Sequence, residues 1–139
     1  MIVIDASLTM AWLLAEPTLA PSLGFDDLFE REALVVPPHW QAEVGNAFIT
    51  ALRRGRIPRD RMEMLVQRLA ALDIQIEPTV GIEQIIPLTE FAATHNLTYY
   101  DAAYVQIALD RSIALGTLDN DMRASARRLN IPLLPAAAP

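Results

Sequence analysis

Four acidic residues stand where carboxylates could do chemistry together. Asp5 follows the apolar run IVI, and Asp119 follows the apolar segment IALGTL. Asp101 opens the stretch DAAYVQIAL, and Glu43 lies one turn into the helical pattern HWQAEVGNAF. Carboxylates brought close together raise one another's pKa unless a cation neutralises them. Because oxygen ligands suit Mg²⁺, with Mn²⁺ also possible, the sequence predicts a site for a divalent cation of this kind.

Each of these acids also has a structural explanation. Aspartate is a preferred N-cap residue, so capping a helix would account for Asp5, Asp101 or Asp119 taken singly. Glu43 alone fits an ordinary charge on a helix surface. Parallel strands, however, present their carboxyl ends at one edge of a sheet, so Asp5 and Asp119 are expected to share a crevice. From these residues alone, both interpretations stay open.

The elements that would position these acids follow from the apolar periodicity. Short strands are predicted at 2–4, 33–36, 74–76, 113–118 and 132–134, and helices at 7–14, 19–32, 40–54, 58–72, 82–94, 102–109 and 122–129. Strands that alternate with helices indicate an α/β fold, in which helices cover both faces of a mostly parallel central sheet. We expect one domain over residues 1–135, followed by a frayed tail at 136–139.

Composition narrows the class of protein. A chain of 139 residues suits one domain. Its hydrophobic content of 53% exceeds the usual 45–50% and predicts apolar surface buried against a partner. The chain has no cysteine, which excludes disulfides and thiolate zinc sites, and it has no lysine, so all 11 basic residues are arginines. No apolar run approaches the ~20 residues of a membrane span, and the start lacks a basic signal region, so a cytoplasmic protein without membrane contact is expected.

An arginine cluster offers a local basic surface on an acidic chain. The net charge of −6 argues against binding nucleic acid by overall electrostatics. A local basic patch could still bind it. The stretch ALRRGRIPRDRMEML places Arg53, Arg54 and Arg56 close together, with two further arginines behind them. One interpretation is a solvated corner between helices. The other is a surface that binds the phosphate groups of a nucleic acid.

The four acidic motifs together resemble a known family. The segments IDAS, PHWQAEVGNA, YYDAAYVQIAL and TLDNDM resemble, in order and spacing, the motifs of PIN-domain ribonucleases, above all the VapC-type toxins of bacterial toxin–antitoxin pairs. The resemblance implies a three-layer α/β/α fold and Mg²⁺-dependent cleavage of RNA. It implies as partners an RNA substrate, a cognate antitoxin protein and a second copy in a homodimer. It assigns catalysis to an acidic quartet and metal binding to three of its members. The quartet is Asp5, Glu43, Asp101 and Asp119, and the metal ligands are Asp5, Asp101 and Asp119.

Three further residues take supporting positions by the same resemblance. Ser7 and Thr117 match small hydroxyl residues that flank the metal site, and Asp121 is an extra acid beside the fourth motif. A metal-free ribonuclease would use paired histidines, or a histidine with a lysine. Here the only histidines are His39, expected at a helix start or in packing, and His95, expected at a helix end.

Other classes fit the sequence less well. Receiver domains and haloacid-dehalogenase-type phosphatases rely on a lysine that this chain lacks. Neither GxxxxGK[ST] nor GxGxxG occurs, so a nucleotide-binding loop of either kind is not supported. The alternative that remains is a catalytically silent PIN-like module that acts through a protein partner.

Overall fold

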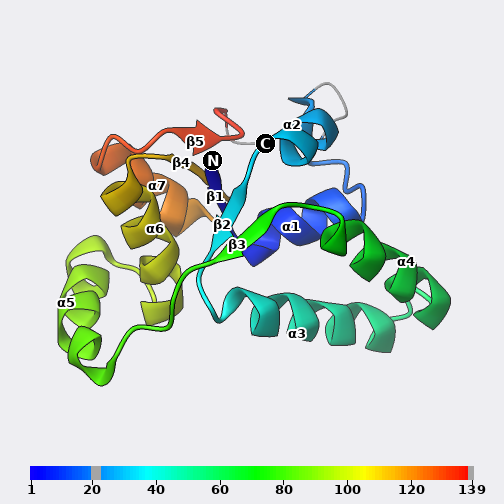
Figure 1. Ribbon diagram of the computed structural model, residues 1–139, viewed down its shortest axis with the longest axis horizontal. Helices are drawn as coiled ribbons and strands as arrows, with labels where there is room; N and C mark the ends of the chain where they lie inside the picture. The colour runs from blue at the N-terminus through cyan, green and yellow to red at the C-terminus, as the bar shows by residue number, and fades with distance from the viewer. Residues whose placement is uncertain (20–22, 138–139) are drawn as a thin grey trace.

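The structure is a computed structural model, and it describes residues 1–19 and 23–137 (Figure 1). Its centre is a sheet of five strands in the order β3–β2–β1–β4–β5, and all neighbouring pairs are parallel. The central strands β1 and β2 are fully buried, as expected where helices cover both faces of a parallel sheet. The strands are β1 (Ile2–Ile4), β2 (Leu34–Val36), β3 (Ile74–Ile76), β4 (Ala114–Gly116) and β5 (Leu133–Leu134).

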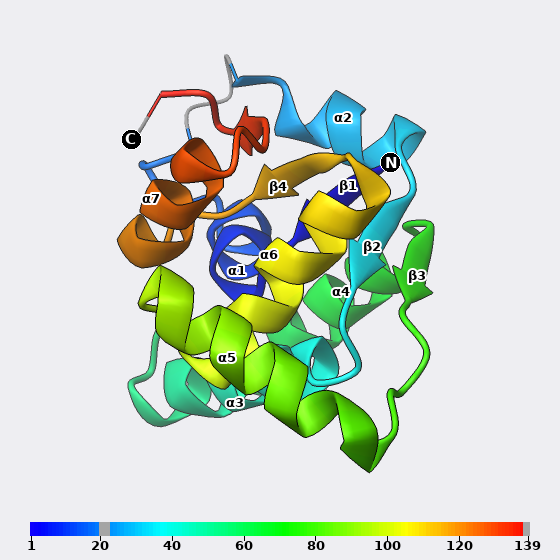
Figure 2. The same cartoon turned by 90° about the vertical axis from the view of Figure 1, so that its left-hand side faces the viewer.

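Helices form the two outer layers. In the view of Figure 1, α5, α6 and α7 lie on one side of the sheet and α1, α3 and α4 on the other; Figure 2 shows α6 in front of β1 and β4. This confirms the predicted three-layer α/β/α fold. The helices are α1 (Ala6–Leu13), α2 (Phe25–Arg31), α3 (Trp40–Arg53), α4 (Arg59–Ala70), the 3₁₀ turn η2 (Ile82–Gln84), α5 (Ile85–His95), α6 (Tyr99–Arg111) and α7 (Asn120–Arg128).

Helix α2 begins later than the sequence predicts. The predicted helix at 19–32 is wrong at its start, because α2 begins only at Phe25, after Gly24 in the left-handed conformation with φ 66°. Part of that prediction, residues 20–22, lies outside the described residues. The prediction at 82–94 is confirmed as η2 followed by α5, in which Pro87 lies in the first turn, where proline is tolerated.

Hydrogen bonds through Thr9 fix the start of α3 against the start of α1. The buried Thr9 hydroxyl donates to the backbone carbonyl of Asp5 at 2.7 Å. The indole Nε1 of Trp40 donates to Thr9 Oγ1 at 3.2 Å. The first turn of α3 therefore lies beside the end of β1.

Glycine is required at the end of β4. A Cβ on Gly116 would lie 2.6 Å from Cδ2 of Leu8, a fully buried core residue, and 3.4 Å from the carbonyl oxygen of Val3. The absence of a side chain thus lets α1 pack directly on the carboxyl end of β4.

Arg123 contacts the backbone near the end of the described chain. Within the predicted frayed tail at 136–139, the guanidinium of Arg123 donates to the carbonyl of Ala136 at 3.3 Å, and residues 138–139 lie outside the described ones. Over residues 1–19 and 23–137, no helix has the length and apolar character needed to cross a membrane.

Candidate active site

The candidate site lies where the order of the strands reverses. The chain builds β2 and β3 on one side of β1 and then returns to build β4 and β5 on the other. In sheets of this kind, ligands bind at the carboxyl ends of the strands at this switch point. Asp5 follows β1 there, and its backbone N–H donates to the carbonyl of Gly116 in β4 at 3.1 Å.

Asp5 is a buried carboxylate, only 5% exposed, with hydrogen bonds to both oxygens. Its Oδ1 accepts from the backbone N–H of Leu8 at 2.8 Å, so Asp5 is the N-cap of α1 and the capping interpretation is confirmed. Its Oδ2 accepts from the Thr117 hydroxyl at 2.6 Å and from the Ser7 hydroxyl at 2.7 Å. Capping a helix needs one acceptor oxygen, whereas both carboxylate oxygens of Asp5 accept hydrogen bonds.

The burial of Asp5 makes its charge costly. Burial raises the pKa of Asp5 to about 6, against the opposing effect of hydrogen bonds from Leu8, Thr117 and Ser7. The negative charge of Asp119 adds to the increase. A nearby cation would favour the ionised form of this carboxylate.

Asp119 caps the next helix at the same edge of the sheet. Its Oδ1 accepts from the backbone N–H of Met122 at 2.9 Å, which makes it the N-cap of α7, and the residue is exposed. Its backbone N–H donates to Thr117 Oγ1 at 3.0 Å. The buried Thr117 hydroxyl therefore contacts both Asp5 and the backbone of Asp119.

The capping explanation for Asp101 is wrong. Thr98 is the N-cap of α6, and Asp101 is the third residue of the helix. The backbone N–H of Asp101 donates to Thr98 Oγ1 at 3.1 Å, and the Thr98 hydroxyl donates back to Asp101 Oδ2 at 2.6 Å. This reciprocal arrangement resembles a capping box and fixes the Asp101 carboxylate at the start of α6.

Glu43 is tied to α6 by Tyr104. The Tyr104 hydroxyl donates to Glu43 Oε2, and His39 Nε2 lies 3.8 Å from the same oxygen. Burial, the hydrogen bond to Glu43 and the charges of Glu43, Asp5 and Asp101 all raise the pKa of Tyr104, burial most. The charges of three members of the predicted quartet thus act on one tyrosine, and the fourth, Asp119, acts on Asp5.

Two residues at the site were not predicted from the sequence to belong to it, namely Tyr104 and His39. The available signal for Tyr104 was its spacing of three residues from Asp101, which puts both near one face of a helix. His39 stands at the start of α3, as expected, and its ring packs edge-on against Tyr100 and Tyr104, with 5.2 Å between centroids in each pair.

The donor set fits a hard divalent cation by its chemistry. The groups at the switch point are carboxylate and hydroxyl oxygens, which Mg²⁺ and Mn²⁺ prefer, and the buried Asp5 carboxylate would gain from a positive neighbour. Within the described part of the chain, however, no three His, Cys, Asp or Glu side chains lie close enough together to hold a metal ion. Asp5, Asp101 and Asp119, the ligands that the resemblance implies, are therefore not brought together as a metal-binding group in the described structure.

The supporting residues divide into two groups. Ser7 and Thr117 both contact Asp5, and Ser7 Oγ also accepts from the backbone N–H of Leu118 at 3.3 Å. Asp121 lies in the first turn of α7 and is exposed. The structure therefore brings the two hydroxyls to Asp5, and it places Asp121 at an exposed position two residues after Asp119.

The arginine cluster lies at the other end of α3 from Glu43. Arg53 ends the helix, so about 15 Å of helix axis separates it from the first turn, which holds Glu43. Arg53, Arg54 and Arg56 are all exposed, and Arg56 pairs with Glu16 at 2.9 Å. These arginines are not part of the acidic site.

Among known proteins, a solved structure shares the fold of this chain. No protein-family model matches the sequence, and no curated protein matches it. The chain is similar to the crystal structure of PAE2754 from Pyrobaculum aerophilum, with 25% sequence identity and a TM-score of 0.67. The similarity covers 89% of this chain and 78% of that one. The two proteins share their overall fold.

Proposed function

We propose that this protein is a Mg²⁺-dependent endoribonuclease of the PIN-domain type that acts in the cytoplasm as the toxin of a VapC-type toxin–antitoxin pair. The sequence support is the resemblance of its four acidic motifs to that family. The structural observation that carries the proposal is the link from Asp5 through the Thr117 hydroxyl to Asp119 at the switch point of the sheet. Glu43 and Asp101 lie near enough to act, with Asp5, on Tyr104.

The reaction needs a nucleophile and neutralisation of phosphate charge. A divalent cation, when bound, would supply Lewis acidity and lower the pKa of an attacking water. Asp5, Asp101 and Asp119 would hold it. Ser7 and Thr117 keep the Asp5 carboxylate in one orientation by donating to it.

Glu43 is the member of the quartet to which the family resemblance assigns catalysis but not metal binding. It is half-buried on α3, and the Tyr104 hydroxyl holds its Oε2 in place. We assign it as the base that takes the proton from the attacking water, with Tyr104 as the residue that positions it.

The partner surfaces follow from exposure and charge. Ile82, Ile85 and Ile86 are exposed apolar residues on η2 and α5, and we call them the isoleucine face. Residues 78–89 carry a single charged side chain, Glu83, so two copies of this face can meet with little repulsion. We assign it to a second copy of the chain in a homodimer. The acidic site suits a cationic side chain of a cognate antitoxin.

One observation favours the alternative of a catalytically silent module. Asp5 and Asp119 both cap helices, so each carboxylate has a structural use without catalysis. In that case the fold would act through a protein partner alone.

Metal dependence tests the proposal. The purified chain is incubated with total cellular RNA in Mg²⁺, in excess EDTA, and in EDTA followed by added Mg²⁺, and the cut ends are mapped. We expect cleavage that stops in EDTA and returns with metal, together with a higher melting temperature in Mg²⁺. Asp119→Asn should abolish cleavage, and Asp60→Asn, at an exposed position in α4, should not. Undiminished cleavage in EDTA would overturn the mechanism, and absence of cleavage in any metal would favour the silent module.

A further inference from the structure

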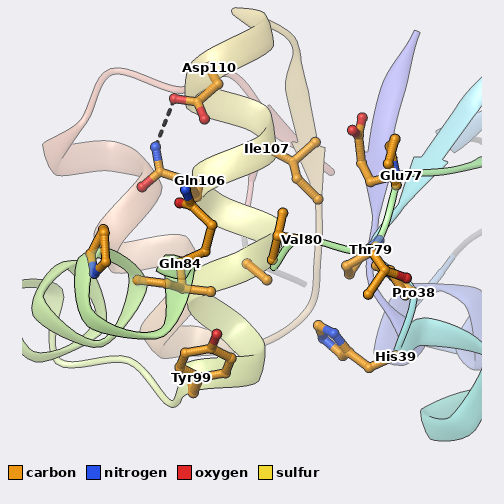
Figure 3. Close-up of a pocket in the computed structure, with 15 residues that line it drawn as sticks. Pro38, His39, Glu77, Thr79, Val80, Gln84, Tyr99, Gln106, Ile107 and Asp110 are labelled. Carbon is orange, nitrogen blue, oxygen red and sulfur yellow. Dashed lines mark hydrogen bonds between the residues drawn. The ribbon is translucent and has the colours of Figure 1, made fainter. Parts of the chain in front are cut away.

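A cavity of about 470 Å³ lies directly beside the acidic site (Figure 3). One wall is α6, the opposite wall is the segment from Glu77 to Leu88, and Pro37, Pro38 and His39 complete it. His39 joins the two sites, because its ring lines the cavity while its Nε2 lies 3.8 Å from Glu43 Oε2. The volume is in the range of small-molecule pockets.

Flat and rigid surfaces make up much of the lining. Four prolines contribute, together with the aromatic rings of Tyr99 and His39. Proline fixes its own backbone angle, so these walls are largely preformed. Such surfaces suit a planar ring more than a flexible chain.

The polar groups on α6 are mainly hydrogen-bond acceptors. Gln106 Nε2 donates to Asp110 Oδ1 at 2.7 Å, as Figure 3 shows, which leaves Gln106 Oε1 and Asp110 Oδ2 free to accept. Glu77 pairs with Arg111 at the edge of the cavity. An anion such as phosphate would be repelled here, whereas a planar group that carries N–H donors would be bound.

We propose that this cavity binds one unpaired nucleobase of the RNA, next to the phosphate that is cleaved, and that it prefers guanine. Guanine presents two adjacent donors, N1–H and the N2 amino group, which match a carboxylate oxygen beside an amide oxygen. Proteins recognise single-stranded RNA by stacking unpaired bases on aromatic side chains and hydrogen-bonding their edges. This inference rests on the proposed function, since it takes RNA as the substrate.

The isoleucine face leaves the cavity accessible. Gln84, Pro87 and Leu88 line the cavity and follow helical spacing, whereas the isoleucine face, Ile82, Ile85 and Ile86, does not line it. The two functions assigned to this segment therefore use different sides of it.

Binding of short RNAs tests the base preference separately from cleavage. Fluorescent pentamers UUGUU, UUAUU, UUCUU and UUUUU are titrated with the intact protein in EDTA, and anisotropy is measured. We expect UUGUU to bind at least about fivefold tighter than UUUUU. Ala103→Phe, which fills the cavity from α6, and Asp110→Asn, which weakens its acceptor edge, should each remove that preference. Asp60→Asn is the matched control and should keep it.

The outcomes separate this inference from the proposed function. Equal affinity for the four pentamers, no binding of any of them, or a preference that survives both cavity variants would overturn the base site. A change of self-association in Ala103→Phe without a change in base preference would instead assign the cavity to a protein interface. Because the titration needs no cleavage, a base preference that the cavity variants abolish supports the inference even if Mg²⁺-dependent cleavage is absent. If RNA is cleaved but the four pentamers bind equally well, the base site is overturned and the proposed function stands.

Discussion

The hydroxyl of Thr117 donates a 2.6 Å hydrogen bond to Oδ2 of Asp5, so the residue after β4 holds the carboxylate that follows β1. The Thr117 hydroxyl oxygen, Oγ1, in turn accepts from the backbone N–H of Asp119 at 3.0 Å. One buried hydroxyl thus connects the two strand ends that form the switch point. Hydrogen bonds to charged groups contribute about 1.5–3 kcal/mol each, so this contact should matter for the ionisation of Asp5.

Replacing Thr117 by valine should raise the pKa of Asp5 above its present value of about 6. Valine keeps the shape of threonine but removes the donor that favours the ionised carboxylate. We expect kcat/KM for RNA cleavage at pH 7 to fall about tenfold and its acidic limb to move to higher pH, measured as a pH–rate profile. Thr117→Ser should restore the profile. Thr50→Val, which removes a hydroxyl bonded to the carbonyl of Asn46 in α3, should leave the profile unchanged.

Replacing Tyr104 by phenylalanine should leave the Glu43 carboxylate less well positioned. The change removes the hydroxyl that donates to Glu43 Oε2 and keeps the buried ring. We expect kcat to fall several-fold with little change in KM, and the free energy of unfolding to fall by about 1 kcal/mol. Steady-state kinetics and denaturant unfolding measure the two effects. Tyr100→Phe, at an exposed ring that also packs on His39, is the control, and an equal loss of kcat there would contradict a positioning role for Tyr104.

Replacing Arg53, Arg54 and Arg56 together by alanine should weaken RNA binding without loss of the fold. Fewer phosphate contacts release fewer counterions, so the slope of log Kd against log salt should become shallower. The change in stability should be small, because these side chains are exposed and surface ion pairs contribute little. Salt-dependent anisotropy measures the slope. An unchanged slope would favour the other interpretation, in which these arginines form a solvated corner between helices and do not bind RNA.

Charging the isoleucine face should separate the proposed homodimer. Ile82 and Ile86 are 83% and 69% exposed, so Ile82→Asp with Ile86→Asp should be tolerated by the monomer and repel a second copy. Sedimentation should then report a monomer. Met64→Asp, at an apolar side chain 61% exposed on α4, is the matched control and should stay dimeric. A dimer that survives the double change would place the interface elsewhere.

The sequence predicts the elements well where local signals decide. All five strands occur at their predicted places, because each is a short apolar run flanked by breaks, although β4 is shorter than 113–118. The positions of Asp5 and Asp119 at neighbouring strand ends follow from the same parallel topology. The predicted start of α2 is wrong, because it depends on the left-handed backbone conformation of Gly24. The N-cap of α6 was missed, because it depends on one hydrogen bond to the Thr98 hydroxyl. Apolar periodicity contains neither signal.

Contacts between distant elements lie beyond such reasoning. The bond between Tyr104 and Glu43 depends on how α3 and α6 sit across the sheet, which no local pattern encodes. Arg123 shows the same limit. It is 1% exposed, although charged side chains are seldom buried without a partner. It donates to the backbone carbonyls of Thr117 and Pro135, and burial lowers its pKa.

The change Asp5→Asn distinguishes a cap from a metal ligand. Asparagine caps helices about as well as aspartate, so a purely capping Asp5 should tolerate the change in both fold and activity. If Asp5 is a ligand, cleavage should fall by orders of magnitude, and Mg²⁺ should no longer raise the melting temperature. Asp60→Asn should change neither property. Cleavage and metal stabilisation at the wild-type level in Asp5→Asn would leave Asp5 as a cap alone.

The pH dependence of stability gives the same variant a second readout. The pKa of Asp5 is about 6 in the folded protein, against an ordinary value near 3.9 when unfolded, so the folded state binds the proton more tightly between these values. The contribution of this group to stability is therefore full below about pH 4 and is lost as the pH rises through 6. Each pKa unit corresponds to 1.36 kcal/mol, so metal-free Asp5→Asn should exceed the wild type by up to ~3 kcal/mol at pH 7 and by little at pH 4. Denaturant unfolding in EDTA at the two pH values measures this difference, and a gap that does not narrow toward pH 4 would show that the Asp5 carboxylate is not destabilised by burial.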